Sequence, residues 1–123
     1  MRPLFLVAAI AAASLLAAPA FAEPQCSTHA NSESRATDPA QVMVMIDAKT
    51  ALKEKLDDSH ASFRSVYFCK TPRDQIAMAC GEVKSPKTKG YVRFLSGGRA
   101  EMTSYDGDGK SGFDSAWNRF CKP

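Results

Sequence analysis

The chain has 123 residues, of which 45% are hydrophobic, and a formal net charge of +3. A nucleic-acid-binding protein usually shows a strong, clustered basic excess, so this weak charge argues against that class. The length suits one small domain, and a domain of this size buries only about 60–65% of its unfolded surface. We therefore expect covalent cross-links to contribute to stability.

The first residues have the pattern of a secretory signal peptide over 1–22. Arg2 supplies a positive start, residues 4–18 are almost all apolar, and Ala20-Phe21-Ala22 is a small-x-small cleavage site. We expect cleavage after Ala22 and a periplasmic or secreted product. The apolar run is shorter than the roughly 20 residues of a spanning helix, and no later segment approaches that length. We therefore expect no transmembrane segment in the mature chain.

The mature chain is expected to begin with a flexible arm over residues 23–37, which are polar and lack large apolar side chains. A single α+β domain is expected over 38–123. Asp38 and Pro39 predict a helix start, with Asp as the N-cap and Pro at the first helical position. This helix is expected to run to about Asp57, with its first turns more deeply buried, and its apolar stripe consists of Val42, Met45, Ile46, Ala48, Leu52 and Leu56.

Four strands and a short helix are expected after this helix. Aromatic and β-branched residues predict strands over 63–69, 75–83, 91–95 and, more weakly, 99–105. Residues 106–112 are rich in Gly and Asp and predict a loop, and residues 113–121 predict a closing helix. The expected fold is α+β: an antiparallel four-stranded meander sheet with the N-terminal helix and the short C-terminal helix packed on one face.

Four cysteines lie in the predicted mature chain, and an even number in an exported protein predicts two disulfides: Cys26, Cys69, Cys80 and Cys121. Strand alternation places Cys80 on the helix-covered side, where Cys121 is its natural partner. It places Cys69 outward, where it can bond Cys26. We favour Cys26–Cys69 with Cys80–Cys121, and a Cys69–Cys80 bridge across the hairpin is the main alternative.

Basic residues gather around two turns of the predicted sheet, with aromatic residues among them. The candidate ligand patch consists of Lys84, Lys87, Lys89, Tyr91, Arg93 and Arg99. Such a patch suits an acidic protein surface or an anionic component of the cell envelope. The alternative is that these charges protect a strand edge from pairing with other chains.

Asp106 and Asp108 are weak candidates for a cation site. In an EF-hand register that begins at Ser104 they take positions 3 and 5, but Ser104 and Ser115 then occupy the terminal ligand positions, where carboxylates are needed. We favour a solvated turn over residues 106–112. We assign no metal and no cofactor.

Catalytic candidates are few. His29 lies in the polar arm and His60 at a helix-to-strand junction, which favours exposed loop residues over oriented bases. Glu82, Glu101 and Asp114 could approach one another in space, but their spacing does not indicate an acid–base pair. We assign no catalytic residue.

The C-terminal half resembles a group of uncharacterised small exported proteins of proteobacteria. The resemblance rests on Phe63-Arg64-Ser65-Val66, Cys80-Gly81-Glu82-Val83, Gly90-Tyr91-Val92-Arg93-Phe94, and Trp117 followed by Cys121. It implies an exported α+β domain, implies no activity, and favours the Cys80–Cys121 pair. Members of the group carry an Asn- and Gly-rich link after the second motif, which residues 84–89 replace here.

The leading hypothesis from the sequence is an exported, non-enzymatic binding module that presents its basic hairpin to a protein or anionic envelope partner. The alternative is a small periplasmic hydrolase or calcium-dependent protein that uses carboxylates near the Asp106–Gly112 loop. The absence of a recognisable catalytic set favours the first hypothesis.

Overall fold

The structure is a computed structural model that describes residues 23–27 and 38–122. The predicted signal peptide and residues 28–37 of the predicted arm lie outside the described residues, as does His29. The elements, in chain order, are β1 (Gln25–Cys26), α2 (Pro39–Leu56), β2 (Ser62–Lys70), β3 (Ala77–Lys84), β4 (Val92–Ser96), η1 (Ala100–Met102), β5 (Thr103–Tyr105) and α3 (Phe113–Phe120).

The strands form one antiparallel meander in the order β1-β2-β3-β4-β5. The α+β class and the antiparallel meander are confirmed, but the expected number of four strands is wrong. The additional strand is β1, where Cys26 pairs with Cys69. The hydroxyl of Ser27 extends this pairing, because it accepts a hydrogen bond from the Phe68 amide at 3.0 Å. A single cysteine in a polar segment gives no strand periodicity, so the sequence pattern did not indicate β1.

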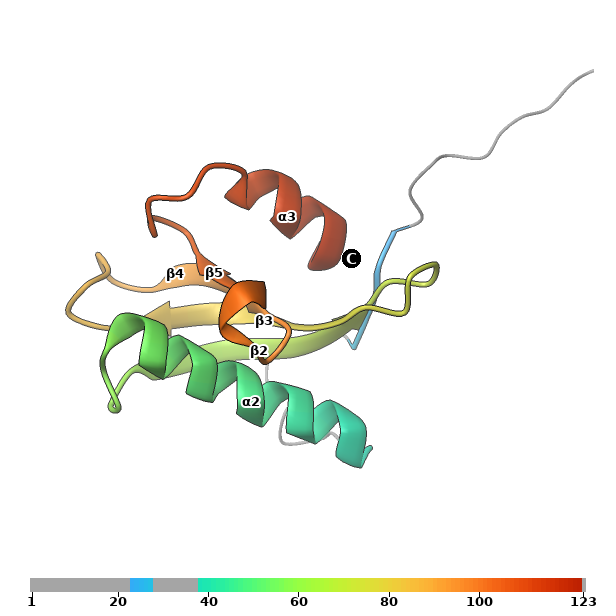
Figure 1. Cartoon of the computed structure of the whole chain (residues 1–123), viewed down its shortest axis with the longest axis horizontal. Helices are drawn as coiled ribbons and strands as arrows, with labels where there is room; N and C mark the ends of the chain where they lie inside the picture. Colours follow the sequence, from blue (N-terminus) through green and yellow to red (C-terminus); the bar gives the residue numbers. More distant parts are fainter. Residues whose placement is uncertain (1–22, 28–37, 123) are drawn as a thin grey trace, which may run out of the picture.

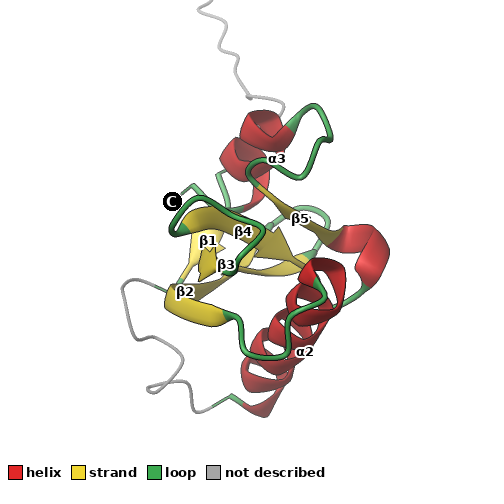
Figure 2. Ribbon diagram, turned by 90° about the vertical axis from the view of Figure 1, so that its left-hand side faces the viewer, coloured by secondary structure: helices red, strands yellow, loops and turns green. Residues whose placement is uncertain are grey.

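The two helices lie on opposite faces of the sheet, which corrects the expectation that both cover one face (Figure 1). The view turned by 90° shows the same arrangement (Figure 2). On the α2 side, Ala79, Val83 and Phe94 pack in one core. On the α3 side, Met78 and Cys80 pack with Cys121 in a second core. Because successive side chains of a strand alternate between faces, the apolar residues on both faces of β3 require two covering layers.

The predicted start of α2 is confirmed. The Asp38 carboxylate accepts a hydrogen bond from the Ala40 amide at 2.9 Å, and Pro39 is the first helical residue. The expectation that the first turns are the more buried end is wrong, because Met43 and Ile46 are 53% and 47% exposed. Five consecutive apolar residues cannot all face one side of a helix with 3.6 residues per turn. The buried stripe runs instead through Met45, Ala48, Ala51, Leu52 and Leu56.

A bulge in β2 explains why one position of β3 requires glycine. The register between these strands shifts between Arg64 and Tyr67, where Ser65 has φ +55°. A Cβ atom on Gly81 would come within 3.0 Å of the Val66 Cα atom and 3.1 Å of the Ser65 carbonyl oxygen. Since both neighbours are backbone atoms, only glycine fits at this position without displacing β2.

The predicted strand over 99–105 is only partly formed, because residues 100–102 make a 3-10 turn before β5. The Thr103 hydroxyl donates to the Arg99 carbonyl oxygen at 2.6 Å and lies 2.6 Å from the Ser96 hydroxyl. These side-chain bonds compete with a regular ladder and hold the turn closed.

All four cysteines are bonded, as Cys26–Cys69 and Cys80–Cys121, and the two favoured pairs are confirmed. The expectation that Cys69 points outward is wrong in one respect. Cys69 does face away from the α2 core, but α3 covers that side, so Cys69 is fully buried. The sulfur atoms of Cys26 and Cys69 both lie within 3.8 Å of the Cys121 carbonyl oxygen, so the two bridges are neighbours.

Within the described ranges, no helix is both long enough and apolar enough to cross a membrane.

Candidate functional site

The β3–β4 turn is closed by the hydroxyl groups of Ser85 and Thr88. The Ser85 hydroxyl accepts from the Lys87 amide at 3.1 Å, and the Thr88 hydroxyl accepts from the Ser85 amide at 3.0 Å. Gly90 completes the turn with φ +70°, a conformation that costs other residues energy. The turn lies at one end of the sheet and has a defined shape, because its amides are bonded within the turn (Figure 1).

Three lysines project from this turn and are exposed to solvent: Lys84, Lys87 and Lys89. None of them forms an ion pair with a carboxylate among the described residues. Their positive charges are therefore available to a partner and screened only by solvent.

Two cationic side chains lie over the ring of Tyr91, which is at the end of the same turn. The Arg64 guanidinium carbon lies 3.9 Å from the ring centroid, and the Lys84 ammonium lies 5.8 Å from it. Arg64 also donates from Nε to the Glu82 carboxylate at 3.0 Å. Sequence reasoning missed Arg64, although the predicted hairpin offered a signal: Arg64 and Glu82 are opposite charges that lie directly across from each other in the register of β2 and β3.

Arg93 does not belong to this group, because its side chain interacts with α3 and with the loop before it. Its Nη2 atom contacts the carboxylates of Asp114 at 2.6 Å and Asp106 at 3.1 Å. Its guanidinium lies over the rings of Phe113 and Trp117, at 5.0 and 5.2 Å. The hydrogen bond to Asp114, followed by that to Asp106, raises the pKa of Arg93 above its ordinary value despite partial burial. Arg93 therefore fastens α3 to the sheet.

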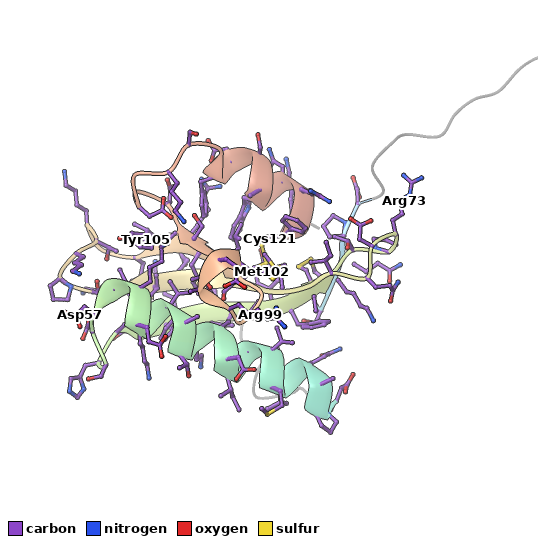
Figure 3. All side chains as sticks on the ribbon, in the orientation of Figure 1. Asp57, Arg73, Arg99, Met102, Tyr105 and Cys121 are labelled. Atoms are coloured by element: carbon purple, nitrogen blue, oxygen red, sulfur yellow. A yellow bond between two sulfur atoms is a disulfide. The ribbon has the colours of Figure 1, made fainter. Side chains whose placement is uncertain are left out.

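Arg99 also lies outside the group. It precedes η1, beyond the other end of β4, and Figure 3 places it between η1 and α2, away from the β3–β4 turn. The structure thus brings together four of the six candidate residues and adds Arg64. We call this set the hairpin patch: Arg64, Lys84, Lys87, Lys89 and Tyr91.

The two candidate cation ligands diverge. Asp106 pairs with Arg93, whereas the side chain of Asp108 is 2% exposed and is enclosed by the loop that follows β5. Asp108 accepts from the Ser104 hydroxyl at 2.7 Å and the Lys110 amide at 2.9 Å. No group of three or more His, Cys, Asp or Glu side chains suited to a metal occurs in the part of the chain that the structure describes.

An ion pair between Asp108 and Lys55 connects the loop after β5 to α2. The Lys55 ammonium lies 3.9 Å from the Asp108 carboxylate. Burial by itself raises the pKa of Asp108, but the hydrogen bonds from Ser104 and from the Lys110 and Tyr105 amides, together with the charge of Lys55, outweigh it and lower the pKa. Burial is also the main reason that the pKa of Lys55 is lowered, and the neighbouring Lys110 lowers it further.

Asp108→Asn is expected to lower the free energy of unfolding by about 1–3 kcal/mol near neutral pH, because a buried charged acceptor is lost. A carboxyl whose folded pKa is depressed stabilises the fold above its unfolded pKa, near 3.8, and loses that contribution as pH falls through the folded value. The difference between wild type and variant should therefore shrink in acid, as measured by urea unfolding over a pH series. Asp106→Asn, at an exposed position, serves as the control with an expected loss below about 1 kcal/mol. A difference for Asp108→Asn that persists unchanged in acid would contradict this role.

The remaining catalytic candidates are dispersed. Glu82 and Asp114 are each paired with an arginine, and Glu101 lies in η1. His60 is exposed, and its amide donates to the Asp58 carboxylate at 2.9 Å. A shallow groove open to solvent follows the end of α2 and is lined by Thr50, Lys53, Glu54, Asp57, Asp58 and Ser59.

No known protein-family model matches the chain, and comparisons with curated proteins and with solved structures give no match either. The resemblance to small exported proteobacterial proteins therefore remains a hypothesis, and the functional argument depends on the geometry of the chain itself.

Proposed function

We propose that this chain is an exported, non-enzymatic binding module that presents the hairpin patch to an acidic protein or an anionic surface of the cell envelope. The observation that carries the proposal is the set of three exposed lysines, unpaired among the described residues, on a turn whose shape is fixed by hydrogen bonds. A rigid display of like charges favours rapid encounter with an anionic partner.

The position of the lysines in the sheet argues against the alternative role of edge protection. They lie on or beside the turn between β3 and β4, and both strands have neighbours on each side in the order β1-β2-β3-β4-β5. Charges that prevent strand pairing are needed on the outer strands. The lysines of the hairpin patch lie away from the outer strands β1 and β5, which favours recognition over edge protection as their role.

Export is supported by the cysteines. Both disulfides join segments about 40 residues apart, and such structural bonds persist in oxidising compartments rather than in a reducing cytosol. Together with the predicted cleavage after Ala22, this supports a periplasmic or secreted location.

The double variant Lys87→Glu/Lys89→Glu is expected to reduce binding to sedimented envelope membranes about tenfold or more. Each lysine near an anionic surface contributes on the order of 1 kcal/mol, and reversal of its charge adds repulsion. The assay compares the bound fraction of purified protein at low and moderate salt, since added salt should weaken the wild-type interaction.

The matched control is Lys70→Glu/Lys122→Glu, which changes two exposed lysines outside the turn and gives the same net charge. This control should retain most of the wild-type binding. Equal losses in the two double variants, or full binding by Lys87→Glu/Lys89→Glu, would show that the hairpin patch is not the binding surface.

A further inference from the structure

The guanidinium of Arg64 is held in place but has unused donors. Its Nε atom donates to Glu82, and its guanidinium carbon lies over the ring of Tyr91, 3.9 Å from the centroid. No acceptor among the described residues takes a hydrogen bond from its Nη1 or Nη2 atoms, and the side chain is 55% exposed. Arg64 therefore offers solvent the two-pronged edge with which arginine binds oxyanions.

Lys84 brings a second cation to the same ring. Its ammonium lies 5.8 Å from the Tyr91 centroid, because Lys84 is two residues beyond Glu82 on β3 and shares its face of the strand. An arginine fork and a nearby ammonium can serve one anion together if that anion has more than two acceptor oxygens. A carboxylate has two oxygens, whereas a terminal phosphate has three.

We infer that Arg64, Lys84 and Tyr91 form a subsite for a terminal phosphate group, either of a soluble phosphate monoester or of a lipid headgroup of that type. The fork of Arg64 binds two phosphate oxygens, Lys84 binds the third, and Tyr91 with Glu82 orients the fork in advance. Lys87 and Lys89 raise the local positive potential around the subsite. This inference rests on the proposed function and names the chemistry that the hairpin patch recognises.

A purely structural role for these residues is the competing explanation, since an opposed Arg64–Glu82 pair stabilises a hairpin without any ligand. The two explanations differ for Arg64→Lys, which retains the charge but loses the fork. They also differ for Tyr91→Phe, which retains the ring, and Tyr91→Leu, which loses it.

The test uses amide and arginine side-chain NMR shifts of the mature protein during titration with inorganic phosphate, and with acetate at matched ionic strength. Phosphate is expected to shift the Arg64, Lys84 and Tyr91 signals, with acetate several-fold weaker. Arg64→Lys and Tyr91→Leu should weaken phosphate binding about fivefold or more, and Tyr91→Phe should weaken it less than Tyr91→Leu. The matched charge loss Lys70→Gln, outside the hairpin patch, should leave it unchanged.

A second arm measures sedimentation with phosphatidylcholine vesicles with and without phosphatidic acid. Binding that depends on phosphatidic acid and is weakened by Arg64→Lys identifies a lipid source, and a response to inorganic phosphate alone identifies a soluble one. Equal responses to phosphate and acetate, or an Arg64→Lys variant that matches wild type in both arms, would overturn the subsite. In that case, loss of envelope binding by Lys87→Glu/Lys89→Glu would still support the proposed function, so the two failures are distinguishable.

Discussion

Phe94→Ala is expected to lower the free energy of unfolding by about 3–5 kcal/mol, the largest effect of any single substitution considered for this chain. Phe94 has no exposed surface and lies in the core between α2 and the sheet. Its ring meets that of Phe63 edge-on, with centroids 5.6 Å apart, and covers Gly81, which has no side chain of its own. The truncation therefore removes buried contacts and leaves a cavity that the neighbouring backbone cannot fill.

Urea unfolding followed by far-UV circular dichroism measures this effect. Met43→Ala is the matched control, because it also truncates a large apolar side chain but at a position that is 53% exposed, with an expected change below about 0.5 kcal/mol. Phe94→Leu should fall between the two. A loss below about 1.5 kcal/mol for Phe94→Ala would contradict the closed packing between α2 and the sheet.

Removal of the Cys80–Cys121 bridge by the double substitution Cys80→Ala/Cys121→Ala is expected to have the second large effect. Chain entropy alone gives about 4 kcal/mol for a loop of this length. Both cysteines are fully buried beneath α3, so the substitution also loosens the contact between α3 and the sheet. The near-ultraviolet circular dichroism of Trp117 should weaken as the edge-on contact of its ring with Tyr67 is lost.

The chain offers its own control in Cys26→Ala/Cys69→Ala. The two bridges span 43 and 41 residues, so loop entropy predicts nearly equal losses. We expect the Cys80–Cys121 deletion to cost more, by about 1 kcal/mol or more, because that bridge anchors a helix, whereas the other anchors the two-residue strand β1. If both double variants lose the same free energy of unfolding in chemical denaturation, the whole effect comes from the greater entropy of the unfolded chain and none of it from the anchoring of α3.

Local features of the sequence were sufficient to predict most of the elements. The Asp38-Pro39 pair marks a helix start because its capping chemistry acts within one turn, and the hairpins follow from aromatic strands separated by turn residues. The disulfide pairs followed from strand alternation, which holds wherever a strand is regular.

The layer arrangement was harder to predict, because it depends on contacts between distant segments. Strand alternation places Cys80 on the helix-covered side of the expected fold, and the other face of β3, with the small residues Ala77, Ala79 and Gly81, then has no covering layer. These small residues accommodate the long helix α2 instead. A count of large side chains does not distinguish an open face from one against which a helix packs closely.

The structure keeps together the candidate patch residues that are close in the sequence and separates those that only share a charge. Lys84 is the last residue of β3, and Lys87 and Lys89 lie in the turn that follows it, so the three stay together in space. Arg93 is on β4, and its role was decided by Asp106 and Asp114, which are more than ten residues away in the chain. Arg64 was missed because its place beside Tyr91 requires β2 and β4 to be arranged around β3.

The two disulfides close successive loops of the chain, and this order has a mechanical consequence. A pulling force applied to the two ends of the folded domain passes from Cys26 to Cys69 and from Cys80 to Cys121 through covalent bonds. The helices, β4 and most of β2 lie within the closed loops and bear none of that tension. Between the two bridges, only the short stretch 70–79 can lengthen under load. Tension applied between the two ends of the domain would therefore not distort the turn that carries its lysines.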